Sequence, residues 1–306
     1  MTDEKLSKLD VGYDLANYDN IIDNIFEKLN SALNLILSKK KLFSAEDFSV
    51  YIYDEYTLGT NNDIYAPINI YICLNKSNNV KKLETKYSNT EAPILHYELD
   101  KLRTELYDII EHFFEDVYEI TKDKYGIKIS SNKHFKELNA QGITYYIRPC
   151  IAYKNKDNID GVIFYTPNRK YIDIDYPLIA GQNFINKVNA TNGLLISYIR
   201  IFKNLYMTYY KVEDLPFEMF ETLFYNVPTE YYKDLSFKTG REIMEYLLNI
   251  DIKTLKTIDE QDLQFNSKYK SLSRLYASRL IRTMHKLMCN PDHKVFDQAI
   301  KRLEQD

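Results

Sequence analysis

Two groups of acidic residues in this sequence are of the type that holds metal ions. Asp173-Ile-Asp175 places two carboxylates on the same side of a predicted strand, where that strand runs into a loop. Asp54, Glu55 and Asp63 surround a Gly/Asn-rich turn further upstream. Carboxylate oxygens are the ligands that Mg²⁺ prefers, so either group could hold a divalent cation. The alternative, which we favour for both groups, is that these acidic side chains are solvated at a strand end and at a turn.

Histidine and cysteine offer weaker metal-binding patterns. Glu111-His112 and Glu115-Asp116 lie one helical turn apart, and His285 and Cys289 stand four residues apart. A structural zinc site needs four ligands, and His285 and Cys289 supply only two, so we interpret them as structural. The three cysteines of the chain are far apart and odd in number, which argues against a disulfide framework and indicates a reducing compartment.

A basic stripe marks a predicted late helix. Arg279, Arg282 and Lys286 share one helix face at i, i+3 and i+7. Such a stripe could contact a phosphate backbone. It could equally be a solvated face or meet an acidic protein partner, and the net charge of −4 gives no general attraction to nucleic acid. These interpretations remain open.

The elements that must position these residues fall into two halves. Period-2 patterns rich in β-branched and aromatic residues predict strands, and apolar residues at helical spacing predict helices. Up to residue 176 the predicted helices are Asn17–Lys39 and Ala92–Lys122, and the predicted strands are Phe48–Tyr53, Ile68–Leu74, Tyr125–Ser130, Ile143–Tyr153, Gly161–Tyr165 and Tyr171–Ile174. From Pro177 onward the pattern is almost wholly helical. We therefore expect an α+β fold: a mixed sheet with flanking helices over residues 1–176, and a helical lobe over residues 177–306.

The N-terminal residues are polar, and no segment has the apolar length that a membrane span requires. The sequence therefore predicts a cytoplasmic protein without a membrane partner.

Three fragments in order along the chain carry a family resemblance. They are Asp160–Tyr165 followed by Tyr176-Pro177, then the stretch Ala190–Asn204 with its Thr-Asn and Ile-Arg-x-x-Lys pattern, and then Glu221–Pro228 ending in Tyr-Asn-Val-Pro. Together they resemble the cyclic-oligonucleotide synthase-like (cGAS/CD-NTase-like) nucleotidyltransferases of bacteria or viruses. The resemblance covers roughly residues 45–250 and implies a nucleotidyltransferase fold. Related active enzymes often serve antiviral signalling.

The resemblance also implies where the family's chemistry would lie. In that family a Gly-Ser turn grips the triphosphate, and an Asp-x-Asp with a third Asp holds two magnesium ions. Here the Gly-Ser pair falls on Asp54 and Glu55, the Asp-x-Asp on Pro67 and Asn69, and the third Asp on Tyr146. This correspondence predicts that the metal ligands are lost.

The helical lobe also has apolar residues where the family has polar ones. The basic residues that follow Thr-Asn fall on Leu194 and Ile196, and a histidine near Pro177 falls on Ala180. Asp54 and Glu55 would repel a triphosphate rather than bind it. We therefore expect weak binding of ATP and GTP.

These departures predict a catalytically inactive pseudo-nucleotidyltransferase that acts as a binding, regulatory or scaffold protein without a cofactor. Its partner would be another protein or a second copy, with a nucleotide or oligonucleotide also possible. The candidate binding residues are Thr191, Asn192, Arg200, Lys203, Arg279, Arg282 and Lys286. Two alternatives stay open. One is an active enzyme with Mg²⁺ moved to Asp173 and Asp175 or to the Asp54, Glu55 and Asp63 group, and the other is a nucleic-acid-binding module that uses the late basic helix.

Overall fold

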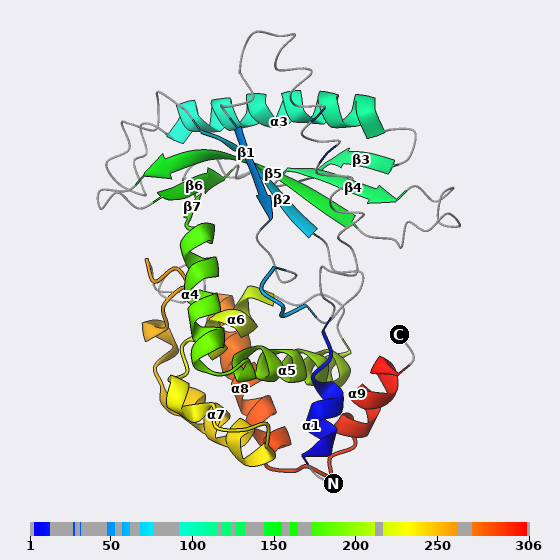
Figure 1. Ribbon diagram of the computed structural model, residues 1–306, viewed down its shortest axis with the longest axis vertical. Helices are drawn as coiled ribbons and strands as arrows, with labels where there is room; N and C mark the ends of the chain where they lie inside the picture. Colours follow the sequence, from blue (N-terminus) through cyan, green and yellow to red (C-terminus); the bar gives the residue numbers. More distant parts are fainter. Residues whose placement is uncertain are drawn as a thin grey trace. The chain divides into compact units, whose positions relative to one another are not determined.

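The computed structural model describes residues 3–12, 27, 31, 48–52, 57–61, 68–75, 92–114, 118–123, 126–131, 144–154, 160–164, 173–211, 217–261 and 271–304. Within these ranges seven strands form one mixed sheet (Figure 1). Its main path runs β1 (Phe48–Ile52), β2 (Ile68–Leu74), β5 (Thr144–Lys154), β4 (Ile127–Ser131) and β3 (Tyr118–Lys122), while β6 (Asp160–Phe164) pairs with β5 and β7 (Asp173–Asp175) pairs with β6.

Strands β2 and β5 form the centre of the sheet and are the parallel pair among the described strands. The other described pairings are antiparallel. Along one edge, β5 pairs with β4 up to Ile147 and with β6 from Cys150 onward. Pro149 lies at this change of partner, between the last residue paired with β4 and the first paired with β6, and proline is tolerated where a sheet ladder is interrupted.

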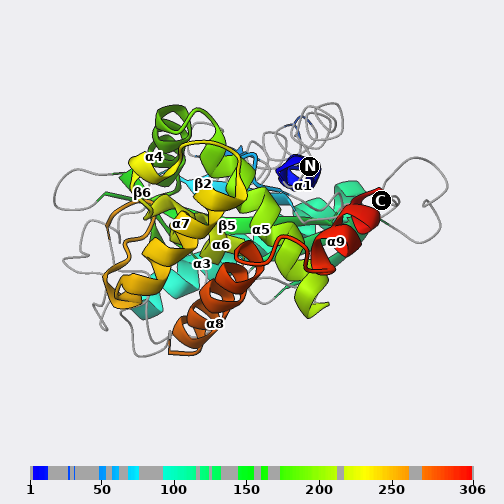
Figure 2. The same cartoon turned by 90° about the horizontal axis from the view of Figure 1, so that it is seen from below.

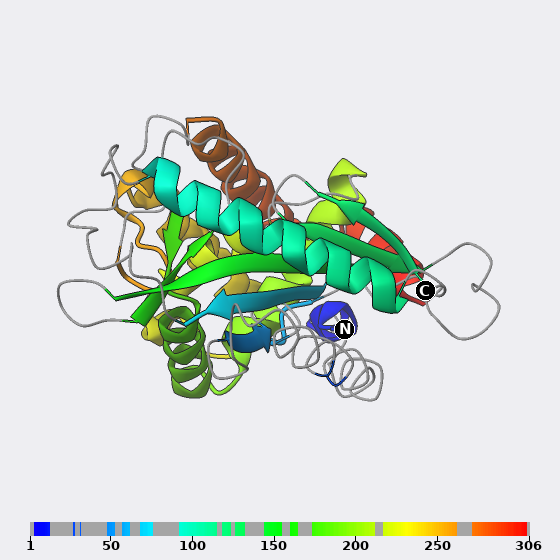
Figure 3. The ribbon, with the colours of Figure 1, turned by 90° about the horizontal axis from the view of Figure 1, so that it is seen from above.

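Helix α3 (Ala92–Phe114) runs across the strands in Figure 3 and covers one face of the sheet. Its stripe of Leu95, Leu99 and Leu106 is buried. Alternation along β2 and β5 sends Ile70 and Ile147 to the buried face. The opposite face of these two strands carries half-buried polar and aromatic residues.

The predicted helix over Ala92–Lys122 is wrong in its last part. The helix ends at Phe114, and Tyr118–Lys122 forms strand β3. The apolar residues of this segment fit the helical period as well as the strand period. It forms a strand because all five residues pair with β4. The predicted helix over Asn17–Lys39 lies almost entirely outside the described residues.

The second half of the chain is helical, as predicted (Figure 2). The described elements are α4 (Pro177–Ala190), α5 (Leu194–Tyr210), α6 (Phe217–Tyr225), η5 (Thr229–Tyr231), α7 (Phe237–Asn249), η6 (Ile252–Thr254), α8 (Ser271–Met288) and α9 (Val295–Leu303), with α1 (Glu4–Leu9) from the N-terminus. Their core includes the fully buried Phe202, Phe220 and Phe296. None of the described helices is long and apolar enough to cross a membrane.

The chain divides into two compact units. One comprises Met1–Tyr13, Leu58–Asp63 and Ile179–Asp306, and the other comprises Asp14–Thr57 and Ile64–Leu178. The helical unit therefore includes two short segments from the first 63 residues as well as the late helices. Contacts from α5, described below, hold both segments.

Gly126 gives a test of the sheet. A Cβ atom at this position would lie 2.1 Å from the backbone oxygen of Ile147, next to the pair Ile127–Ile147 of strands β4 and β5. We expect Gly126→Ala to lower the free energy of unfolding by about 3 kcal/mol or more, since only a backbone shift relieves the clash. Gly193→Ala is the control, because Gly193 has a positive φ but open space around its Cα, and should cost about 1 kcal/mol. Urea unfolding measures both, and equal effects would contradict the described β4–β5 register.

Candidate functional site

Asn69 and Tyr146, two of the positions matched to the family's metal ligands, lie side by side. They are register partners in the parallel β2–β5 pair. Register partners on neighbouring strands direct their side chains to the same face, so both belong to the half-buried face of the sheet. This face is opposite the one that packs on α3. The remaining matched positions, Asp54, Glu55 and Pro67, lie outside the described residues, as does Asp63.

Arg148 occupies the same face, two residues beyond Tyr146. Its Nε donates to Asn69 Oδ1 at 3.1 Å, and its guanidinium lies 4.8 Å from the centre of the Tyr146 ring. Its Nη1 is also 3.5 Å from Asp123 Oδ2, and the side chain is 22% exposed. A permanently charged cation therefore contacts both residues at once. The three side chains form a cluster, Asn69–Tyr146–Arg148, that offers no carboxylate to a cation.

The Asp-x-Asp of the relocated-site alternative lies on β7, at the edge of the sheet. Strands β5 and β6 separate β7 from β2. Asp175 Oδ1 accepts a hydrogen bond from the backbone N–H of Tyr176 at 2.8 Å, which caps the strand end. The side chain of Asp173 lies outside the described part of the structure. Among the residues that the structure describes, no three His, Cys, Asp or Glu side chains gather as a metal site would require.

Helix α5 carries Arg200 and Lys203, and both point into the helical unit. Arg200 Nε donates to the backbone oxygen of Gly59 at 2.8 Å, and its Nη1 is 3.9 Å from Asp10 Oδ1. Lys203 is fully buried, and its Nζ contacts Glu221 Oε1 at 2.5 Å and the backbone oxygen of Thr60 at 3.2 Å. These two cations hold the Gly59–Thr60 turn on α5.

Glu221, on α6, completes this buried group. Its Oε1 also accepts from Thr60 Oγ1 at 2.6 Å, and both side chains are essentially inaccessible. Next on α5, Asn204 donates from Nδ2 to the backbone oxygen of Leu9 and accepts from Arg302 Nη2, each at 2.9 Å. The polar face of α5 thus organises the N-terminal segment, the turn and the C-terminal helix within one unit.

Thr191 and Asn192 form the turn between α4 and α5. Thr191 Oγ1 lies 3.0 Å from the backbone oxygen of Lys187 and accepts from the N–H of Leu195 at 3.3 Å. Asn192 is exposed and adopts a positive φ of 50°, followed by Gly193 at 84°. The Thr-Asn-Gly sequence therefore has a structural explanation as a helix–helix turn. Ligand binding by these residues, and by Arg200 and Lys203, stays a prediction.

The three cations of the late helix lie on α8 and are exposed. The guanidinium of Arg279 lies 5.3 Å from the centre of the Tyr210 ring, whose hydroxyl is 2.7 Å from Thr283 Oγ1. Arg282 instead borders a cavity against α7. Two of the three cations therefore face different neighbours, and their contact with a phosphate backbone stays a prediction.

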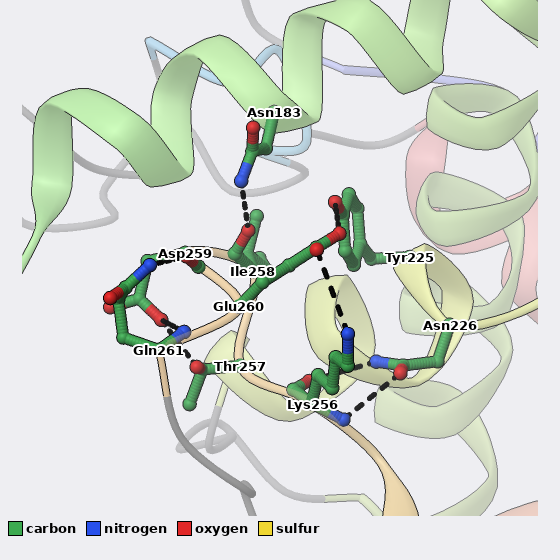
Figure 4. A network of polar contacts seen from close by, with 9 residues as sticks. All are labelled: Asn183, Tyr225, Asn226, Lys256, Thr257, Ile258, Asp259, Glu260 and Gln261. Carbon is green, nitrogen blue, oxygen red and sulfur yellow. Dashed lines mark hydrogen bonds and ion pairs between the residues drawn. The ribbon is translucent and has the colours of Figure 1, made fainter.

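The Tyr-Asn of the family-like fragment anchors a loop (Figure 4). The amide of Asn226 donates to the backbone oxygen of Lys256 at 2.9 Å and accepts from its N–H at 3.0 Å. Tyr225 donates to Glu260 Oε1 at 2.7 Å, and Asn183 of α4 donates to the backbone oxygen of Ile258. Burial raises the pKa of the Tyr225 phenol, and its bond to Glu260 adds to this effect. These contacts give the Tyr-Asn of this fragment a structural role, which is to hold the loop in place.

Comparisons with known proteins agree with this architecture. Residues 182–288 match the model of the cGAS/DncV-like nucleotidyltransferase C-terminal helical domain. A cyclic UMP-AMP synthase of Rhodothermus marinus is 25% identical over an alignment of 189 residues, and the match covers 57% of this chain and 65% of that enzyme. A cyclic dipyrimidine nucleotide synthase, CdnE, of Legionella pneumophila is 24% identical over 266 residues, covering 79% of this chain and 84% of the relative.

The solved structures give the same result for the fold. The structure of Rhodothermus marinus CdnE c-UMP-AMP synthase with Apcpp and Upnpp matches with a TM-score of 0.67 at 18% identity, over 93% of this chain and 95% of that one. The helical-domain match, the two synthases and the shared fold all agree. Residues 182–288 thus match the helical domain of the cGAS/DncV-like nucleotidyltransferases, and the chain resembles synthases of this family over most of its length. The matched segment spans just under two thirds of the Rhodothermus enzyme, at 65% of its length.

Two residues of this cGAS/DncV-like chain were missed by sequence reasoning. Arg148 could have been found from the sequence. It stands two residues after Tyr146 on a predicted strand, so the two side chains must share one face of the sheet. Glu221 could not, because its partners Lys203 and Thr60 are 18 and 161 residues away.

The buried ion pair of Lys203 and Glu221 gives a second prediction. Lys203→Met leaves a buried carboxylate without its cation, so we expect a loss of about 3–5 kcal/mol in the free energy of unfolding. The double variant Lys203→Met/Glu221→Leu should regain most of this loss. Urea unfolding monitored by circular dichroism measures each variant.

The control for this pair is the exposed ion pair Lys233–Glu242, at 2.7 Å. Lys233→Met should change stability by less than about 1 kcal/mol. If Lys203→Met costs no more than Lys233→Met, the buried pair does not stabilise the helical unit.

Proposed function

We propose that this chain is a cGAS/DncV-like protein that does not condense nucleotides and acts by binding, as a regulatory or scaffold protein beside antiviral nucleotide signalling. The observation that carries the proposal is the Asn69–Tyr146–Arg148 cluster. The two-metal mechanism of nucleotidyl transfer needs carboxylates at the metal positions, because Mg²⁺ requires hard oxygen ligands in octahedral geometry. An amide, a phenol and a guanidinium do not supply them.

Electrostatics supports the same proposal. A metal ion neutralises charge that develops on the transferring phosphoryl group and activates the attacking hydroxyl. Arg148 is already engaged by Asn69 and by the Asp123 carboxylate. Its charge disfavours a divalent cation nearby. The chain can therefore keep the fold of its relatives while this face of its sheet lacks their metal chemistry.

The partner in this proposal is another protein or a second copy of the chain, and a cytoplasmic location fits its cysteines. Cys73, Cys150 and Cys289 are all free thiols, as is usual in a reducing compartment. A nucleotide or oligonucleotide held without turnover would also be compatible with a binding role.

Catalysis can be tested directly. The purified chain, incubated with labelled ATP, GTP, CTP and UTP and with Mg²⁺ or Mn²⁺, should release no pyrophosphate and form no oligonucleotide. The Rhodothermus marinus cyclic UMP-AMP synthase, run in parallel, shows that the assay detects product. Product from this chain would refute the proposal. If that product disappears in Asp173→Asn/Asp175→Asn but persists in the matched variant Asp160→Asn, the metal site has moved to β7.

Nucleotide affinity provides an independent test. We expect ATP and GTP to bind with dissociation constants weaker than about 1 mM, which corresponds to about 4 kcal/mol of binding free energy. Adding Mg²⁺ should leave this affinity unchanged, since Asn69 and Tyr146 offer no carboxylate to a bridging metal. Isothermal titration calorimetry with and without Mg²⁺ measures both quantities.

The contrary outcome of this titration is also specific. Micromolar binding that is lost in Arg148→Gln, and kept in Arg241→Gln on the exposed side of α7, would make the protein a nucleotide sensor. The catalytic assay would then still decide separately whether turnover occurs.

A further inference from the structure

A basic-rimmed groove lies within the helical unit, where α8 passes the end of α7 and the short helix η6. It encloses a cavity of about 290 Å³. The lining includes Leu247 and Leu248 of α7, Ile252 and Lys253 of η6, and Ile281 and Arg282 of α8. All of these residues belong to one compact unit. The groove is therefore independent of the Asn69–Tyr146–Arg148 cluster.

The interior of the groove is apolar. Leu247 and Ile281 form its buried floor, each with 1% of its surface exposed. Leu248, at the mouth of the cavity, is 39% exposed. Leu275 is not part of the lining, but it shares a face of α8 with Ser278 and Arg282 and is 65% exposed. Large aliphatic side chains left in water in and beside a cavity are typical of a surface that docks a partner.

The rim of the groove carries positive charge. Helix α8 contains four Arg or Lys residues and no Asp or Glu over 18 residues, in a chain whose net charge is −4. Arg282 and Lys253 are exposed and form no ion pair with any residue that the structure describes. The one carboxylate in the lining, Asp251, accepts from the N–H of Lys253 at 3.0 Å and caps η6. The groove is thus complementary to acidic groups that flank an apolar one.

Size and lining distinguish the possible occupants. A cavity of about 290 Å³ is at the lower limit for drug-sized ligands, and is better filled by one or two side chains of a peptide. Single-stranded nucleic acid binds through aromatic platforms on which bases stack. Among the described residues that line this cavity none is aromatic, although the chain has 28 tyrosines. A protein segment therefore fits the groove better than a nucleotide or a nucleic acid strand.

We propose that the α7–α8 groove docks an acidic segment of a protein partner. A leucine-like side chain of that segment fills the cavity over Leu247 and Ile281, and its carboxylates pair with Arg282 and Lys253. Helix-in-groove recognition of this kind combines apolar anchors with complementary charge. This groove thus gives the chemistry of the partner that the proposed binding role requires. The docking proposal would still hold if the chain proved to be an enzyme.

The test uses the full chain and a defined probe. The probe is a short fluorescein-labelled peptide in which leucines recur at helical spacing among glutamates. Fluorescence polarisation should show saturable binding that weakens as salt is raised. Arg282→Glu should weaken it by about tenfold, because a rim charge is reversed, and Leu248→Ser should weaken it as well.

Matched controls decide the outcome. Lys286→Glu makes the same charge change one helical turn along α8, outside the groove lining, and should alter the affinity by less than about twofold. A peptide with lysines in place of glutamates should not bind. Absence of saturable binding by the acidic peptide, or equal weakening by Lys286→Glu and Arg282→Glu, would overturn the proposal.

Nucleic acid is the competing occupant of this helix. Oligothymidylate that binds and is weakened equally by Arg279→Glu, Arg282→Glu and Lys286→Glu would assign α8 to a phosphate backbone and overturn the peptide site. Thermal unfolding of each variant by circular dichroism separates lost binding from lost folding. The nucleotide-turnover assay shares no reagent with this experiment, so the two proposals can fail separately.

Discussion

The parallel pairing of β2 with β5 determines what chemistry the half-buried face of the sheet can perform. Its backbone hydrogen bonds place Asn69 beside Tyr146, whatever side chains those positions carry. Alternation then brings Arg148 to the same face. The fold of a cGAS/DncV-like protein depends on this register, and its chemistry depends on three side chains that contribute little to the core. The architecture can therefore persist while the site changes.

Helix α5 has a comparable organising role in the helical unit. A surface helix normally directs its cations to water, but Arg200 and Lys203 point inward and bind the Gly59–Thr60 turn. Burying a lysine is tolerated here because Glu221 and a backbone carbonyl satisfy it. The consequence is that a turn from the first quarter of the sequence folds as part of a unit built from its second half.

Sequence patterns predicted the regular elements well where one period was unambiguous. Strand β2 was predicted to the residue and β5 to within one residue at each end. The segment Tyr118–Lys122 was mispredicted, because its apolar residues fit a helix as well as a strand until β4 pairs with it. The register places Asn69 beside Tyr146. Their correspondence to the family's metal-ligand positions came from the resemblance and stays a prediction.

Contacts between distant segments were beyond the reach of sequence patterns. The hydrogen bond from Arg148 to Asn69 spans 79 residues, and the one from Thr60 to Glu221 spans 161. Local periodicity carries no information on which side chains meet over such separations. The groove between α7 and α8 is a further example, since its aliphatic lining resembles ordinary helix core until the packing leaves part of it open.

The position of Arg148 has a consequence for how this protein can evolve. An aspartate introduced at Asn69 would meet the guanidinium at about the distance of the present hydrogen bond, 3.1 Å, and form a charge-assisted pair. A metal ion would then have to displace an arginine that never loses its charge. Under the proposed correspondence, a metal site here would require changes at Pro67, Asn69, Tyr146 and Arg148 together, and the intermediate sequences would gain little metal affinity from single steps. If the metal site was lost as proposed, Arg148 would act as an epistatic barrier to its return.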